Sequence, residues 1–264
     1  MSMVSVNGIE LYSEVHGKGE PLVLIAGLTA HSQHWSNQVP VFSKHFKTIL
    51  LDNRNSGRSD VTDQGSIKLM ADDVVGLMDA LEVDRAHMVG RSMGGYIAQQ
   101  IAISHPARVN RLVLGSTAPV SSTRNKLLLS HLLQLREQGL GMRDLLKDFL
   151  FWMNPPLVVN DPKAFEQTIE EILSDPYFQS LEGFRNQVNA ILEYDTRKQL
   201  NRIQSPTLVV CGKEDILITN NEAEALMVGI PNAKVIVIDG SGHDIHADQA
   251  EQFNQVVLEF LNGK

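Results

Sequence analysis

Short apolar runs alternate along the chain with longer segments in which apolar residues recur every three or four positions. The runs are rich in Val, Ile and Leu, which is typical of strands buried on both faces of a mostly parallel sheet. We expect such strands at residues 22–26, 48–51, 86–89, 111–114, 207–211 and 234–238. Residues 9–16 instead alternate apolar and polar side chains, which predicts an antiparallel edge strand. Strands that alternate with helices indicate a doubly wound α/β fold with helices on both faces of the sheet.

The segments between these strands predict amphipathic helices. Apolar side chains recur at helical spacing between residues 67 and 81 and again between 253 and 261, so each segment has one face to bury. Between about residues 116 and 204 the alternation stops, and four successive helices are expected at 126–135, 142–151, 162–173 and 181–192. An insertion between two strands lies over one end of the sheet. We therefore predict a core of residues 1–117 and 205–264 and a helical cap, or lid, of residues 118–204.

Composition narrows the class of protein. The chain has 264 residues with 43% hydrophobic residues, and its 23 Lys and Arg against 31 Asp and Glu give a net charge of −8. This balance, without any basic block, argues against a nucleic-acid or anionic-membrane partner. No secretion signal is readable in residues 1–20, and no apolar run approaches the ~18 residues that cross a bilayer. We expect a globular protein whose partner is a small-molecule substrate; the sequence does not indicate an oligomeric state.

Cysteine usage points to a reducing compartment. Cys211 is the single cysteine, which excludes an intrachain disulfide and a cysteine-rich zinc site. We therefore expect a cytoplasmic location.

The candidate nucleophile lies between an expected strand and an expected helix. Residues 89–95 read Val-Gly-Arg-Ser-Met-Gly-Gly and contain the pattern Gly-x-Ser-x-Gly around Ser92. The pattern alone is weak evidence, but a strand, a sharp glycine-rich turn and a helix at 93–104 together match a nucleophile elbow. The helix N-terminus also favours negative charge on a reacting oxygen.

A serine hydroxyl needs a base and an orienting carboxylate to become a nucleophile. Asp215 and His243 follow Ser92 in that order, and each comes directly after an expected strand. Because the carboxyl ends of parallel strands meet at one edge of a sheet, we expect the three side chains to converge there. Glu214 is the alternative acid, and Asp239 is a weaker one.

The remaining histidines carry no comparable pattern. His31 and His34 stand three residues apart, and His246 lies close to His243, but no cysteine or carboxylate cluster completes a ligand set with them. We therefore expect no metal and no cofactor.

Taken together, these segments make the whole chain resemble the α/β-hydrolase superfamily. Within it, the chain is most similar to the capped small-substrate group that includes 3-oxoadipate enol-lactonases and aminoacrylate-type hydrolases. The matching segments are residues 24–28, 52–59, 90–95, 212–215 and 240–243. The resemblance implies that the backbone N–H groups of Leu28 and Met93 form an oxyanion hole, a contribution of ~3 to 4 kcal/mol per donor.

The chain departs from the family pattern at several positions. Ala26 replaces the histidine that often precedes the oxyanion loop, Asn55 replaces a glycine, and Thr219 replaces a proline. Arg91 is also uncommon at its position. It is a candidate substrate-binding residue that would favour anionic ligands, as would a cap arginine reaching inward; the cap arginines considered are Arg124, Arg143 and Arg185. Most cap aromatics are expected in the cap interior, with one or two, Trp152 among them, facing the substrate.

The function that fits these residues best is hydrolysis of a small carboxylic ester, lactone or related acyl compound through an acyl-Ser92 intermediate. A serine nucleophile argues against haloalkane dehalogenase chemistry, for which the superfamily uses a carboxylate. Asp244, where carbon–carbon bond hydrolases have Trp, makes that class a poorer match. Two alternatives stay open: a ligand receptor or stress-signalling partner without turnover, and a cofactor-free perhydrolase.

Overall fold

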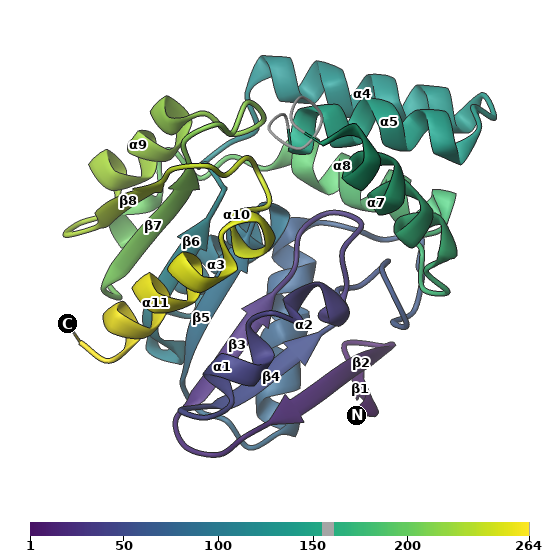
Figure 1. Ribbon diagram of the computed structural model, residues 1–264. Coiled ribbons are helices and arrows are strands. Elements are labelled where there is room, and N and C mark those ends of the chain that lie inside the picture. The colour runs from purple at the N-terminus through teal and green to yellow at the C-terminus, as the bar shows by residue number, and fades with distance from the viewer. Residues whose placement is uncertain (155–160, 264) are drawn as a thin grey trace.

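The computed structural model describes residues 1–154 and 161–263, which fold around one eight-stranded sheet (Figure 1). The strands are β1 (Ser2–Val6), β2 (Ile9–His16), β3 (Pro21–Ile25), β4 (Lys47–Leu51), β5 (Ala86–Arg91), β6 (Val109–Gly115), β7 (Thr207–Gly212) and β8 (Lys234–Ile238). Their order across the sheet is β1-β2-β4-β3-β5-β6-β7-β8. β3 to β8 run parallel to one another, and β2 is antiparallel to β4. The predicted α/β fold with a mostly parallel sheet is confirmed.

One sequence prediction about the sheet is wrong. Residues 9–16 form an antiparallel strand, but it is not the edge, because β1 pairs outside it from Ser2 opposite Ser13 to Val6 opposite Ile9. β1 is short and largely exposed, so it lacks the apolar run by which the other strands were predicted. Asn7 and Gly8, both with positive φ (46° and 78°), form the turn between the two strands. An Asn-Gly pair is the usual signal for such a tight hairpin, and it would have revealed β1.

Alternate residues of the parallel strands build separate cores on the two faces of the sheet. Val23 and Ile25 of β3 pack on the face covered by α2 (Ile67–Ala80), α3 (Met93–Ser104) and α9 (Asn220–Gly229). Leu22 and Leu24 pack on the other face, with α1 (Val39–Phe42) and α11 (Ala250–Leu261). This arrangement accounts for the apolar runs of β3 to β7, because both faces of these strands are covered, whereas the edge strand β8 is partly exposed.

Between β6 and β7, the described residues form four α-helices that lie together beyond the carboxyl ends of the parallel strands (Figure 1). They are α4 (Thr123–Glu137), α5 (Met142–Met153), α7 (Pro162–Ser174) and α8 (Leu181–Glu193). Ser122, Asp161 and Ser180 cap three of them by accepting from a backbone amide of the first turn. The division at residues 118 and 204 stays a prediction, and residues 155–160 of the predicted cap and residue 264 of the predicted core lie outside the described residues.

Two further observations concern membrane-spanning helices and the single cysteine. Within the described residues, no helix combines the length and the apolar character that a bilayer crossing needs. Cys211 is a buried free thiol in β7, and burial raises its pKa to about 11.

Candidate active site

Ser92 lies in a sharp turn that leaves no room for a side chain at Gly90 or Gly94. It separates β5 from α3 and has φ 55° and ψ −122°. A Cβ on Gly94 would lie 2.1 Å from the carbonyl oxygen of Ile25, and one on Gly90 would lie 2.3 Å from the carbonyl oxygen of Gly94. Glycine is therefore required on both sides of the serine. A non-glycine residue with positive φ costs energy, and such strain concentrates at functional sites.

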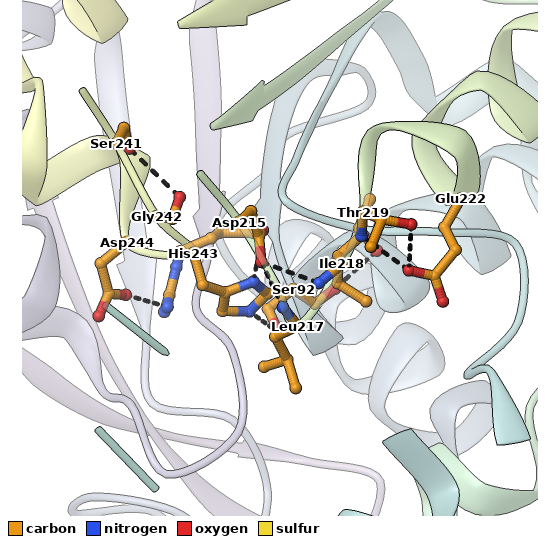
Figure 2. A network of polar contacts seen from close by, with 12 residues as sticks. Ser92, Asp215, Leu217, Ile218, Thr219, Glu222, Ser241, Gly242, His243 and Asp244 are labelled. Atoms are coloured by element: carbon orange, nitrogen blue, oxygen red, sulfur yellow. Dashed lines mark hydrogen bonds and ion pairs between the residues drawn. The ribbon is translucent and has the colours of Figure 1, made fainter. Parts of the chain in front are cut away.

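The structure brings Ser92, His243 and Asp215 into one chain of contacts (Figure 2). His243 Nε2 lies 3.0 Å from Ser92 Oγ, and His243 Nδ1 lies 2.9 Å from Asp215 Oδ2. The three residues come from the turn after β5, the loop after β8 and the loop after β7. The carboxylate accepts a hydrogen bond from Nδ1–H, which keeps that proton on Nδ1 and leaves Nε2 of the neutral ring free to accept the serine proton.

Asp215 is held rigidly behind the histidine. Its Oδ1 accepts the backbone N–H groups of Leu217 (2.9 Å) and Ile218 (2.8 Å), as Figure 2 shows. Its side chain is 0% exposed, and that of His243 is 1% exposed. The two amides fix the rotamer of the carboxylate and leave Oδ2 for the imidazole.

The two alternative acids lie elsewhere. Glu214 Oε2 accepts the backbone N–H of Ser241 at 2.9 Å and thereby supports the loop that carries His243. Asp239 forms an exposed ion pair with Lys213 at 2.8 Å. Neither carboxylate contacts the His243 ring, so Asp215 is the acid that the geometry favours.

The His243 loop is tied to α5 and to Asp248. His243 N donates to the carbonyl oxygen of Met153, the last residue of α5, at 2.8 Å. Asp248 Oδ2 accepts from Gly242 N at 2.9 Å, and its Oδ1 accepts from the Asn154 side chain at 2.6 Å. A shift of α5 would therefore displace the backbone of the histidine.

Leu28 and Met93 are the residues predicted to form the oxyanion hole. Both line the cavity that contains Ser92 and His243. Met93 is the first residue of α3, so its N–H has no carbonyl acceptor within the helix. The loop before Leu28 has no histidine to brace it, and the Asn53 side chain instead donates to the carbonyl oxygen of Ala26 at 2.9 Å. Asn55, the other departure, has φ 69°, which asparagine tolerates better than most residues.

Two adjoining cavities lie between the sheet and the helices after β6. The smaller encloses about 470 Å³ of space, including its open mouth, and contains Ser92 and His243. The larger, of about 800 Å³ on the same measure, extends beneath α4, α5 and α7. The two share four lining residues: Leu28, Arg91, Phe149 and Met153. The larger cavity therefore adjoins the one that contains the serine.

Arg91 lines both cavities, but its charge is already compensated. The side chain is 5% exposed and forms an ion pair with Asp244, the residue that follows His243. Burial acts to raise the pKa of Asp244, but Arg91 and the neighbouring histidines together outweigh burial and lower the pKa. The pair links the serine turn to the histidine loop, so the geometry favours a structural contact over the predicted anion-binding role.

Trp152 and the three cap arginines point away from the cavities. Trp152 is half-buried with its ring centroid 6.2 Å from that of Phe151, and it lines neither cavity. Phe149 and Met153 are four residues apart and line the cavities from one face of α5. Trp152 precedes Met153 by one residue and is therefore rotated from it by roughly 100° around the helix axis. The arginines form exposed ion pairs instead: Arg124 with Glu222, Arg143 with Glu166 and Glu170, and Arg185 with Glu137.

Sequence reasoning missed Arg136, which lines the larger cavity. Arg136 lies seven residues after Leu129, four after Leu132 and three after Leu133. Residues at these spacings share one face of a helix, so Arg136 lies on the same face of α4 as these buried leucines. A charged residue at a position where the helical spacing calls for an apolar one was the signal by which Arg136 could have been predicted to face the cavity.

The histidines weighed as metal ligands have other contacts. His31 Nε2 lies 2.7 Å from Asp175 Oδ2, and its ring meets that of His34 edge-on. His246 packs edge-on against Trp35 with a centroid distance of 5.0 Å. Across residues 1–154 and 161–263, no group of three His, Cys, Asp or Glu side chains is placed to hold a metal ion.

Because His246 is buried, the free energy of unfolding should decrease as the pH is lowered. Burial and, to a lesser extent, Arg91 lower its pKa to about 3, whereas an unfolded histidine titrates near ~6.5. Above pH ~6.5 the ring is neutral in both states. Below it only the unfolded chain gains the proton, so the unfolding free energy falls by about 1.4 kcal/mol per pH unit until the folded pKa is reached. In urea unfolding between pH 4.5 and 7.5, the slope should be smaller in His246→Gln than in wild type by about 1.4 kcal/mol per pH unit. His34 and His87, whose pKa is also lowered by burial, contribute equally to both proteins.

His45→Gln is the matched control, because His45 is exposed, and it should keep the wild-type slope. Asp248 contributes in the opposite direction, since burial raises its pKa to about 6, but this contribution is common to all three proteins. A stability difference between wild type and His246→Gln that does not change with pH would contradict the assignment.

Comparison with known proteins identifies the family. A family model described as the alpha/beta hydrolase fold matches residues 20–250. The chain belongs to the α/β-hydrolase family. A protein of Caulobacter sp. (strain K31), named as a candidate carbamate hydrolase RutD, is 30% identical over 262 residues, which are 96% of this chain and 96% of its own.

Solved structures of this family are similar over the whole chain. The enol-lactonase of Burkholderia xenovorans LB400 has a TM-score of 0.86 and 26% identity and covers 99% of this chain and 100% of its own. A thermophilic esterase of Thermogutta terrifontis, solved with malate bound, has a TM-score of 0.85 and 28% identity. The match covers 98% of this chain and 96% of the esterase. The resemblance to small-substrate α/β-hydrolases is confirmed, and the comparisons support a hydrolase of small molecules.

Proposed function

We propose that the protein hydrolyses a small carboxylic ester or lactone through an acyl-Ser92 intermediate. The single observation that carries the proposal is the buried contact chain Ser92–His243–Asp215 at the wall of a cavity. A hydroxyl, an imidazole and a carboxylate in this geometry are the parts needed to activate a serine.

In the first step, Ser92 Oγ attacks the substrate carbonyl while His243 Nε2 takes the hydroxyl proton. Asp215 keeps the other proton on Nδ1 and stabilises the imidazolium that forms. The N–H groups of Leu28 and Met93 donate to the developing oxyanion. Collapse of the tetrahedral intermediate breaks the bond to the leaving oxygen, which receives the proton from His243.

In the second step, water attacks the acyl group on Ser92 with His243 again as the base. The oxyanion forms in the same position and is stabilised by the same two amides. The acid product then leaves, and Ser92 regains its proton. Every group in both steps comes from the chain itself.

We further propose that residues 118–204 act as a lid over this site. Phe149 and Met153 of α5 line both cavities, and the Met153 carbonyl accepts from His243 N. A lid in this position would exclude water from the acyl-enzyme until the leaving group departs, and it limits the substrate to a small one.

A carbamate is the second candidate substrate, favoured by the relative named as a candidate carbamate hydrolase. Its carbonyl would be attacked in the same way, with an amine or alcohol as leaving group. A cytoplasmic location is still proposed from the single, buried cysteine.

The test is turnover on a panel of short esters, lactones and carbamates at equal concentration. We expect many product molecules per protein for an ester or lactone, and a mass increase equal to the acyl group on Ser92 in rapidly quenched samples. A stoichiometric burst without further turnover would favour the receptor alternative. Activity that requires added hydrogen peroxide would favour the perhydrolase.

A further inference from the structure

The larger cavity contains a cation that no carboxylate compensates. Arg136 of α4 is half-buried and lines this cavity. One of its N–H groups donates to the carbonyl oxygen of Gln179. Its guanidinium lies 5.0 Å from the ring centroid of Phe184 and 5.5 Å from that of Phe178. No carboxylate within the described residues pairs with it, and burial lowers its pKa, as expected for an uncompensated cation.

The other charged groups of the cavity wall are already paired. Arg91 forms its ion pair with Asp244, and Asp175 contacts His31 at 2.7 Å. His34 lies in the same wall, and burial lowers its pKa to about 4, so its ring is neutral at pH 7. Within the described residues, Arg136 is therefore the cation of this cavity wall that pairs with no carboxylate.

Much of the wall of the larger cavity is apolar. Leu132, Leu145, Leu146, Phe149 and Met153 line it. Such a surface fits a hydrocarbon segment, whereas the guanidinium at its end offers planar N–H donors to an oxyanion. The two aromatic rings restrict water around the guanidinium, which strengthens a contact with a charged ligand.

We propose that Arg136 binds a carboxylate of the substrate, so that the preferred substrate is an ester or lactone that also carries a free carboxylate a few carbon atoms from the reacting carbonyl. This inference rests on the proposed hydrolytic function and specifies its substrate class. The net charge of −8 opposes an anion at long range, so the preference comes from the local contact and persists at high salt.

The experiment compares monomethyl esters of straight-chain dicarboxylic acids, from succinate to sebacate, with matched esters in which a neutral primary amide replaces the free carboxylate. Wild type should prefer the carboxylates by about 10- to 100-fold in kcat/KM at one chain length, at both 50 mM and 500 mM salt. Arg136→Gln should remove that preference mainly through KM. The neutral esters should change by less than about threefold, which shows that the variant is folded.

Arg185→Gln is the matched control, because Arg185 is a cap arginine whose exposed ion pair with Glu137 lies away from the cavity, and it should retain the preference. Arg136→Lys should recover part of it, since the charge remains but the planar pair of donors is lost. Equal rates for carboxylate and amide esters in wild type would overturn the proposal, as would equal losses on both in Arg136→Gln.

Binding of the product separates this proposal from the hydrolytic one. Ser92→Ala cannot form an acyl-enzyme but keeps Arg136, so it should bind a dicarboxylate such as glutarate or adipate more tightly than the corresponding monoamide. Loss of this preference in the double variant Ser92→Ala, Arg136→Gln is expected. If wild type hydrolyses only neutral esters, the hydrolytic function stands and the carboxylate subsite fails. If Ser92→Ala retains turnover, the hydrolytic mechanism fails while the binding result still tests Arg136.

Discussion

Replacing Ser92 with alanine is expected to lower kcat by about 10⁶-fold, the loss that follows when the nucleophile of such a triad is removed. The Oγ that lies 3.0 Å from His243 Nε2 is then absent, so no acyl-enzyme can form. Alanine keeps a Cβ and leaves the flanking glycines in place, so the strained turn is preserved. Steady-state kinetics on the best substrate of the panel measures the loss.

A fluorophosphonate probe gives a second readout of the same prediction. It should label wild type once, at Ser92, and should not label Ser92→Ala. Ser104→Ala is the matched control, because Ser104 is an exposed serine at the end of the same helix α3, and it should keep both labelling and activity. A label on another serine, or full activity of Ser92→Ala, would refute the assignment of the nucleophile.

Most of the sheet could be predicted because strands β3 to β7 are buried on both faces. Their apolar runs are a direct consequence of that burial, and the six predicted runs differ from β3 to β8 by at most two residues at either end. The positions of the residues that follow β5, β7 and β8 could be predicted from the order of strands and helices, since the carboxyl ends of parallel strands share one edge of the sheet. Ser92, Asp215 and His243 could therefore be expected to converge before any distance was known.

The substrate-facing residues could not be predicted in the same way. Whether an arginine faces a cavity depends on the rotation of its helix and on which carboxylates lie nearby, and neither is local to the sequence. Arg91 meets Asp244 from 153 positions away, and Arg185 meets Glu137 from 48 positions away. Among the cations that line the larger cavity, Arg136 is left without a carboxylate partner, within the described residues, only after such pairs have formed.

Asp215→Asn is expected to lower kcat by up to about 10⁴-fold while leaving the fold intact. Oδ1 of Asp215 accepts the amides of Leu217 and Ile218, so the asparagine carbonyl oxygen will keep that position. Its NH₂ group then faces His243 Nδ1 and donates to it, which places the ring proton on Nε2. In this tautomer Nε2 donates to Ser92 instead of accepting its proton, so the serine is no longer activated.

Glu214→Gln is the matched comparison, because Glu214 precedes Asp215 and accepts only the backbone N–H of Ser241. The glutamine carbonyl oxygen can accept the same hydrogen bond, so the His243 loop keeps its support and kcat should fall by less than about tenfold. Thermal unfolding of both variants close to that of wild type would show that the difference is chemical rather than structural. The reverse ranking of the two variants would transfer the acid role to Glu214, and equal small losses would mean that neither carboxylate fixes the histidine tautomer.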